Sequence, residues 1–241
     1  MQEVLDRARV EDAVFALRPD YRALLIAVDG LVPGPSDETS DTLLRAAEAS
    51  ARLTDRPVEE LPHIASWREA YRAFGAKPQR TRNSAEALLR RAQDGLPRVN
   101  RLTDVYNAIS VLHQIPVGGE DLSRYVGAPR LIRADGSEAF DTVAGGEDAT
   151  EHPAAGEVVW CDDIGVTCRR WNWRQGRRTQ LTEATTTALF ILDVLDPLTD
   201  EHLITVADEL IEHLLRLGPD VQVAKRLIAS SSTAAAAGPE D

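Results

Sequence analysis

The stretch that decides the fold is LPRVNRLTDVYNAISVLHQIPVGGEDL, residues 96–122. Four of its apolar residues recur at helical intervals: Leu102, Val105, Ile109 and Leu112. This spacing predicts an amphipathic helix, and Pro116 is expected to follow its end because proline cannot donate a helical hydrogen bond. Asn107 lies within this apolar helix, and a buried amide needs partners. It is therefore either a structural bridge to a neighbouring loop or a polar group that lines a pocket.

Helices and short strands are expected on both sides of this stretch. Strands are expected in segments bounded by turn residues: 10–17, 21–28, 130–134, 138–141, 157–161 and 166–173. Helices are expected where the pattern is amphipathic or apolar: 40–53, 59–74, 181–196 and 201–217. A further helix is expected after Ser84, whose hydroxyl can cap it. Two Gly-Gly pairs, at 118–119 and 145–146, are expected to be turns. Helices grouped around short strands indicate the α+β class.

Length and composition indicate a folded globular chain. With 241 residues, of which 43% are hydrophobic, it can bury a full core. We expect a single domain over 1–217, with an N-terminal part to about residue 75 and a core part from about residue 76. Residues 218–241 are expected to be a partly disordered tail, since SSSTAAAAGPED has no apolar face to bury.

The chain is expected to be cytoplasmic. It has no apolar run of about 18 residues that could span a bilayer, and the N-terminus MQEVLDRARVED lacks the cationic start and apolar run of a signal peptide. Cys161 and Cys168 are expected to be reduced, packed thiols, although their spacing could bring them together across a hairpin.

Cations gather in one segment of an otherwise acidic chain. The net charge of −12 argues against indiscriminate binding to nucleic acid, including DNA. Residues 68–101 nevertheless hold nine Lys or Arg against three acids. Within them, Lys77, Arg80 and Arg82 form a loop ahead of a helix start that could grip phosphates. The alternative is that these side chains form surface ion pairs with the abundant acids.

A second basic cluster, CRRWNWRQGRR at 168–178, contains two tryptophans and no acid. If this segment is a strand, alternation places Trp171 and Trp173 on one face and Arg170 and Asn172 on the other. Such a surface could stack an unpaired base, an interaction worth roughly 1–3 kcal/mol. Alternatively, the rings fill a core and the arginines pair with acids elsewhere in the chain.

Common catalytic motifs are absent. The sequence has no phosphate-binding Gly-rich loop, no G-x-S-x-G and no G-x-G-x-x-G. Its five histidines lack metal-ligand spacing, so no metal and no cofactor are expected.

Three stretches together resemble the B3/B4 domain: YRAFGAKPQRTRNSAEALLRR, LPRVNRLTDVYNAISVLHQIPVGGEDL and EVVWCDDIGVTCRRWNWRQGRRT. The bacterial phenylalanyl-tRNA synthetase β-subunit carries this module for hydrolytic editing, and the module also occurs as free-standing proteins. The resemblance implies an α+β fold with mixed and antiparallel sheets packed against helices. It also matches Asn107 to the pocket asparagine of the family, whereas Tyr106 stands in place of a threonine and Gly118 near the position of a histidine.

The resemblance implies hydrolysis of mischarged aminoacyl-tRNA in trans. Asn107 would then donate to the ester carbonyl, while a carboxylate positions or deprotonates water. The candidates for that carboxylate are Glu120, Asp121 and Asp162. The acceptor end of tRNA would be held by the basic loop and the tryptophan segment. Two alternatives remain: a non-catalytic module that binds tRNA or an amino acid, and a protein that binds or hydrolyses a small aminoacyl compound.

Overall fold

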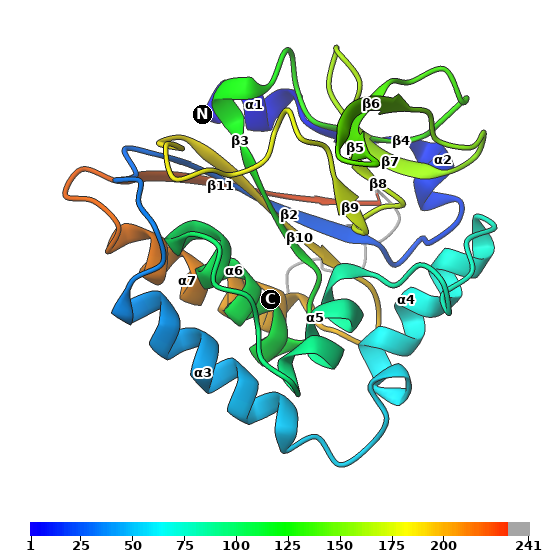
Figure 1. Ribbon diagram of the computed structural model, residues 1–241. Coiled ribbons are helices and arrows are strands. Elements are labelled where there is room, and N and C mark those ends of the chain that lie inside the picture. The colour runs from blue at the N-terminus through cyan, green and yellow to red at the C-terminus, as the bar shows by residue number, and fades with distance from the viewer. Residues whose placement is uncertain (231–241) are drawn as a thin grey trace, which may run out of the picture.

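The computed structural model describes residues 1–230, which form two β-sheets and their covering helices (Figure 1). A four-stranded antiparallel sheet runs in the order β11-β2-β10-β3, with β2 at Arg22–Asp29, β3 at Val117–Asp121, β10 at Ala188–Val194 and β11 at Gln222–Ala229. A seven-stranded sheet runs in the order β1-β4-β7-β8-β5-β6, with β9 paired to β8. Its strands are β1 (Arg9–Val10), β4 (Arg130–Arg133), β5 (Phe140–Ala144), β6 (Glu147–Glu151), β7 (Val158–Cys161), β8 (Val166–Arg169) and β9 (Arg174–Gln175).

Seven α-helices occur among residues 1–230: α1 (Gln2–Arg7), α2 (Asp12–Phe15), α3 (Glu38–Arg52), α4 (Pro62–Ala73), α5 (Ser84–Ala92), α6 (Arg101–His113) and α7 (Asp200–Leu215). In Figure 1, α3, α6 and α7 lie on one side of the four-stranded sheet and the seven-stranded sheet lies on the other. None of the described helices is long and apolar enough to cross a membrane. The combination of helices with mixed sheets confirms the α+β class.

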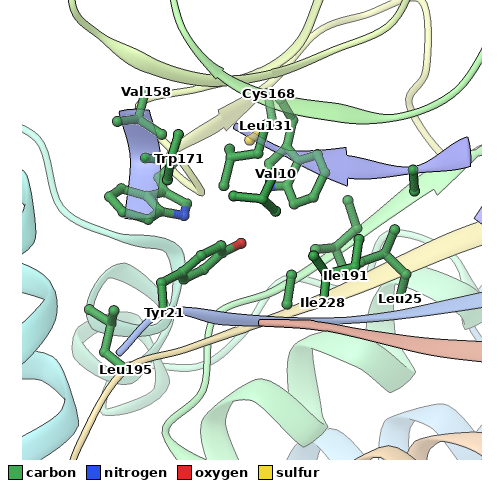
Figure 2. Packing of buried hydrophobic residues seen from close by; sticks show 14 of the residues in the cluster. Val10, Tyr21, Leu25, Leu131, Val158, Cys168, Trp171, Ile191, Leu195 and Ile228 are labelled. Carbon is green, nitrogen blue, oxygen red and sulfur yellow. The ribbon is translucent and has the colours of Figure 1, made fainter. Parts of the chain in front are cut away.

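The central strands of the four-stranded sheet, β2 and β10, are buried on both faces, and strand alternation divides their side chains between two cores. Leu24 and Ile26 of β2 pack in a cluster with Ile109 of α6 and Val206 of α7. Leu25 points the other way, into a cluster with residues of the seven-stranded sheet such as Leu131. Figure 2 shows this second cluster, with the side chains of the two sheets facing each other. A strand covered on both faces reads as a continuous apolar run.

That double burial explains the largest error of the sequence analysis. The predicted helix over 181–196 is wrong, because its apolar half is the central strand β10, every residue of which is buried. A short apolar run without alternation does not distinguish a buried strand from a buried helix. By contrast, the predicted helices over 40–53, 59–74 and 201–217 correspond to α3, α4 and α7, and the predicted strand over 21–28 corresponds to β2.

Several boundaries also differ from expectation. The predicted strand over 10–17 is wrong, since β1 is followed at once by α2. Asn83 rather than Ser84 caps α5, because its side chain accepts a hydrogen bond from the Glu86 amide at 2.9 Å. The Gly-Gly pair at 118–119 lies within β3, whereas the pair at 145–146 does form a turn, with positive φ at both residues.

The predicted partly disordered tail from residue 218 is wrong over Gln222–Ala229, because these residues form strand β11. Every residue of this segment pairs with β2, so the segment is an edge strand of the four-stranded sheet. Residues 231–241, which are all but the first residue of SSSTAAAAGPED, lie outside the described part of the chain. Cys161 and Cys168 are both buried and free, so they are not joined to each other.

Candidate functional site

A pocket of about 250 Å³ lies where α5, α6, β3 and β10 meet the seven-stranded sheet. Its walls are apolar where helices and strands pack, with the side chains of Ala87, Leu88, Val117, Trp160, Trp171 and Ile191. Polar groups reach it from five different segments: Ser84, Asn107, Glu120, Asn172, Gln175 and Asp193. A mainly apolar pocket with a few convergent polar groups is the usual form of a small-ligand site.

Asn107 lines this pocket and does not bridge two parts of the fold. Its residue is only 8% exposed, yet its side-chain amide has no hydrogen-bond partner among residues 1–230. Ser84, at the start of α5, also lines the pocket, and its buried hydroxyl likewise has no partner in the described chain. Buried polar groups are normally bonded, so unpaired donors at one cavity are available to a ligand or water.

Glu120 is the buried carboxyl that β3 contributes to the pocket. The Tyr125 hydroxyl donates to it. Burial raises the pKa of Glu120 to about 7, and the negative charge of Asp162 adds to that effect. A carboxyl with a pKa near neutrality can both accept and release a proton at physiological pH.

Asp193 is a second buried carboxyl in the pocket, and the sequence analysis did not identify it. It accepts hydrogen bonds from the Tyr21 hydroxyl at 2.5 Å and from Asn172 Nδ2 at 3.2 Å. Burial raises its pKa to about 7, with a further contribution from the charge of Glu120. The sequence signal was a single acid inside the apolar run ALFILDVL, which is a costly residue to bury without a reason.

The other two predicted carboxylates do not line the pocket. Asp121 caps a short 3-10 helix at Leu122–Arg124 and also accepts from the Thr185 hydroxyl at 2.9 Å. Asp162 lies in the turn after β7, where it pairs with Arg178 at 2.8 Å and accepts from three backbone amides. Burial alone would raise the pKa of Asp162, but the bonds from Arg178 and the amides outweigh it and hold that pKa below its usual value. Both carboxylates therefore stabilise turns instead of facing the cavity.

No group of three or more His, Cys, Asp or Glu side chains within residues 1–230 is placed to hold a metal ion.

The tryptophan segment does not form the alternating strand that was expected. The strand β8 ends at Arg169, and Arg170 and Trp171 adopt positive φ values of 48° and 70°. Trp171 is fully buried and makes edge contacts with Tyr21 and Trp67, so it has no free face for a base. Its placement in the core is the alternative that the sequence left open.

Trp173 and Asn172 occupy different positions in the same turn. Trp173 lines the pocket, is partly exposed, and carries the Arg170 guanidinium 4.3 Å above its ring. Asn172 is buried; its side-chain oxygen accepts from the Tyr71 hydroxyl at 2.9 Å, which directs its amide group toward Asp193. Asn172 therefore positions a pocket carboxyl.

Comparison with known proteins decides the family. The model of the B3/4 domain matches residues 66–214, which is more than half of the 241-residue chain. The chain belongs to the B3/4 domain family. A solved structure similar to it is an N-terminal fragment of the phenylalanyl-tRNA synthetase β-subunit from Pyrococcus horikoshii, with a TM-score of 0.45 and 12% sequence identity. That similarity covers 90% of this chain and 49% of the fragment, so the chain spans about half the length of that structure. No curated protein matches the chain.

The basic loop of this B3/4 chain lies beside a second hollow of about 280 Å³. Lys77, Arg80 and Thr81 line it together with Arg170, whose guanidinium donates to the Thr81 hydroxyl at 2.6 Å. Within the described residues, the side chains of Lys77 and Arg80 form no ion pair.

Most other cations of the basic segment are paired internally. The buried carboxylate of Glu86 is contacted by three arginines: Arg68 at 2.7 Å, Arg90 at 3.2 Å and Arg82 at 3.6 Å. Arg98 pairs with Glu48 at 2.6 Å. The sequence analysis placed Arg82 with Lys77 and Arg80 in a phosphate-binding loop. Because Arg82 forms an ion pair with Glu86, only Lys77 and Arg80 remain as available cations of that loop.

Proposed function

We propose that this chain hydrolyses the ester bond of aminoacyl-tRNA, with the aminoacyl group held in the pocket between the two sheets. The observation that carries the proposal is the unpaired Asn107 amide in the same pocket as the Glu120 carboxyl. One group is a hydrogen-bond donor without a partner and the other is an acid with a pKa near 7. Ester hydrolysis requires both, a donor for the developing oxyanion and a base for the attacking water.

In this mechanism Glu120, in its carboxylate form, accepts a proton from a water molecule as that water attacks the ester carbonyl carbon. Asn107 Nδ2 donates to the carbonyl oxygen, which becomes negatively charged in the tetrahedral intermediate. The Ser84 hydroxyl is a further available donor. When the carbon–oxygen bond of the ester breaks, protonated Glu120 returns its proton to the leaving ribose oxygen. No covalent intermediate with the protein is needed, because an aminoacyl ester is already reactive.

The family relationship supports a tRNA-related function, and the hollow at the basic loop supports contact with phosphates. Lys77 and Arg80 have charges available there, and Arg170 links the hollow to the pocket because its guanidinium stacks on Trp173. A phosphate in the hollow would thus lie beside the group in the pocket. Trp173, which is partly exposed, is the ring available to stack the terminal base.

The acidic net charge favours a second candidate, the binding or hydrolysis of a small aminoacyl ester without RNA. Four of the eight arginines in the basic segment contact Glu86 or Glu48, which reduces the cationic surface that is available to RNA. The two candidates differ in tRNA affinity, since phosphate contacts make binding strongly dependent on salt.

The decisive experiment is a deacylation assay with a panel of charged and mischarged tRNAs, using the wild type, Asn107→Ala and a matched control. We expect Asn107→Ala to reduce the rate about 10²–10³-fold, the usual loss for one oxyanion donor, with a wild-type melting temperature. The control is Asn100→Ala in the same helix, where the side chain caps the first turn by accepting from the Thr103 amide at 2.9 Å. It should cost about 1 kcal/mol of stability and leave the rate unchanged.

Two results would refute this function. The first is the absence of hydrolysis with every tRNA tested, which would leave a binding module. The second is wild-type hydrolysis by a stable Asn107→Ala protein.

A further inference from the structure

The pocket contains two buried carboxyls and no cation that pairs with either. Glu120 and Asp193 are 2% exposed, and both line the cavity. Their hydrogen-bond donors are neutral: the hydroxyls of Tyr125 and Tyr21 and the amide of Asn172. Neither carboxyl forms an ion pair with any of residues 1–230.

The other buried acids among residues 1–230 fall into two groups: those paired with an arginine, and those that accept from a backbone amide. Glu157 is paired with Arg169 at 2.8 Å, and Asp162 with Arg178 at 2.8 Å. Such pairing is the usual requirement for burying a carboxylate, because removing the charge from water is otherwise costly.

Asp104 and Asp121 have no arginine, but they accept from the Val99 and Ser123 amides at 2.9 and 3.0 Å. Among the buried acids of residues 1–230, the pocket pair differs in receiving neither an arginine nor a backbone amide.

The cations near the pocket are already engaged. Of residues 1–230, Arg174 is the one cationic residue that lines the pocket, and its guanidinium donates to the Thr142 hydroxyl at 2.5 Å and lies 3.8 Å from Glu151. The positive charge of Arg178 reaches Glu120, but Asp162, its ion-pair partner, opposes that effect. A ligand is left to supply the compensating charge.

We propose that the pocket selects a ligand with a protonated amine, and that Asp193 is the acceptor that determines this selectivity. The inference rests on the proposed function in so far as it takes this cavity as the ligand site. An aminoacyl ester has an α-ammonium next to the carbonyl that Asn107 would hold, and a basic side chain offers a second ammonium. The shared chemistry is an ammonium placed between two carboxyls.

Proton uptake by the empty pocket is consistent with this selectivity. The raised pKa values mean that protons compensate the carboxyls in the absence of a ligand. Among residues 1–230, the titratable groups that face Asp193 from its neighbouring elements include Tyr21 just before β2, Tyr71 of α4, Glu120 of β3 and Cys168 of β8, all uncharged or negative. An ammonium that replaces the protons should therefore release them to the buffer on binding.

Binding of non-hydrolysable amides tests the proposal without RNA and without turnover. The probes are L-norleucinamide, L-lysinamide and their N-α-acetyl derivatives, measured by titration calorimetry at neutral pH in buffers of different ionisation enthalpy. We expect N-α-acetyl-norleucinamide, which has no charge, to bind about 10–100-fold more weakly than the best amine, since a charge-assisted bond is lost. Norleucinamide and N-α-acetyl-lysinamide separate the two sources, because each keeps one ammonium.

The variant Asp193→Asn keeps the shape of the side chain and an oxygen that can accept from Tyr21. It should lose the preference for amines, with a melting temperature equal to or above that of the wild type, since no charge remains to be buried. Asp121→Asn, outside the pocket, is the control that should keep the preference. Equal affinity of wild type for charged and uncharged probes, no binding by any probe, or an amine preference that survives in Asp193→Asn would each overturn the proposal.

The result is separable from the hydrolytic function. An amine preference in a protein that deacylates no tRNA would support this selectivity and refute the proposed hydrolysis. Deacylation without an amine preference would support the proposed hydrolysis and refute this selectivity.

Discussion

The turn between β7 and β8 and the pocket between the sheets both bury carboxyls, but they treat them in opposite ways. In the turn, Asp162 receives an arginine and three amides, and its pKa is lowered. In the pocket, Glu120 and Asp193 receive only neutral donors, and their pKa values are raised to about 7. Burial is common to both regions, so the difference lies in the partners. A carboxylate whose bonds are complete within the fold stabilises it, whereas one with incomplete bonds is available for chemistry.

The same contrast applies to the cations. Arg178 is used by Asp162 and by the Arg124 carbonyl, so it has little capacity left for a ligand. Lys77 and Arg80 line a hollow and have no ion pair within residues 1–230. The number of charges along the sequence does not distinguish an engaged cation from an available one. The number of hydrogen bonds and ion pairs that each cation forms in the fold does.

Glu120→Gln should show the largest effect. If Glu120 is the base, the variant loses deacylation about 10²–10⁴-fold at neutral pH, the usual contribution of general-base catalysis. The wild-type rate should rise with pH and level off above about 7, where Glu120 is ionised. Glu48→Gln, a buried glutamate bonded to Arg98 away from the pocket, is the control and should keep the rate per folded molecule. A Glu120→Gln protein with the wild-type rate and pH profile would show that Glu120 is not the base.

Asp162→Ala should have the next largest effect, on stability. Removing one partner of a buried pair leaves the Arg178 guanidinium uncompensated, and such losses are about 3–5 kcal/mol. Denaturant unfolding should show this decrease, while hydrolysis by the remaining folded protein stays at the wild-type level. If Asp193→Asn destabilised the fold as strongly as Asp162→Ala, the pocket carboxyl would stabilise the fold as the turn carboxyl does, and the contrast between the two regions would be refuted.

The pH dependence of stability should distinguish the two regions by its sign. A folded pKa of about 7 for Glu120, above its ordinary 4.5, means that the native state keeps a proton that the unfolded state loses. Stability therefore falls as pH rises from about 4.5 to about 7, by about 3 kcal/mol for this group. Asp162 has the opposite sign, since its stabilisation is present above its ordinary pKa of 3.8 and lost as pH falls through the lowered value.

Urea unfolding of wild type and Glu120→Gln across this pH range checks that prediction. The variant should gain stability relative to wild type as pH rises toward about 7 and show no further relative change above it. A stability difference between the two proteins that does not depend on pH would contradict the raised pKa of Glu120.

The part of the site that the sequence predicted is the part carried by one helix. The helical spacing around Asn107 identified α6, and the family resemblance, confirmed by the domain match, pointed to the same residue. Glu120 was one of three candidate carboxylates named with the resemblance, and of the three it is the one that lines the pocket. The helices α3 and α7 were also predicted from helical spacing, since each has one solvated face that makes its periodicity visible.

The missed features depend on contacts between distant segments. Asp193 was hidden because β10 is buried on both faces and shows no alternation. The position of Trp171 depends on positive φ at two consecutive non-glycine residues, which no propensity favours. The pairing of Arg82 with Glu86 is instead a local contact between residues four apart, and only Arg68 reaches that carboxylate from a separate helix, α4.

The smallest effect is expected for the basic loop, and it tests the cationic half of the comparison. If Lys77 and Arg80 each contact one phosphate of tRNA, their double alanine variant should reduce the slope of log affinity against log salt by about two units, about one per contact. Arg98→Ala removes a cation of the same segment that is already paired with Glu48 and Asp41, and it should leave the slope unchanged. Filter binding at several salt concentrations measures both slopes. Equal slopes for wild type and the double variant would remove the loop from the tRNA contact and favour a small aminoacyl ligand, whereas a reduced slope for Arg98→Ala would show that internal pairing does not predict which cations are available.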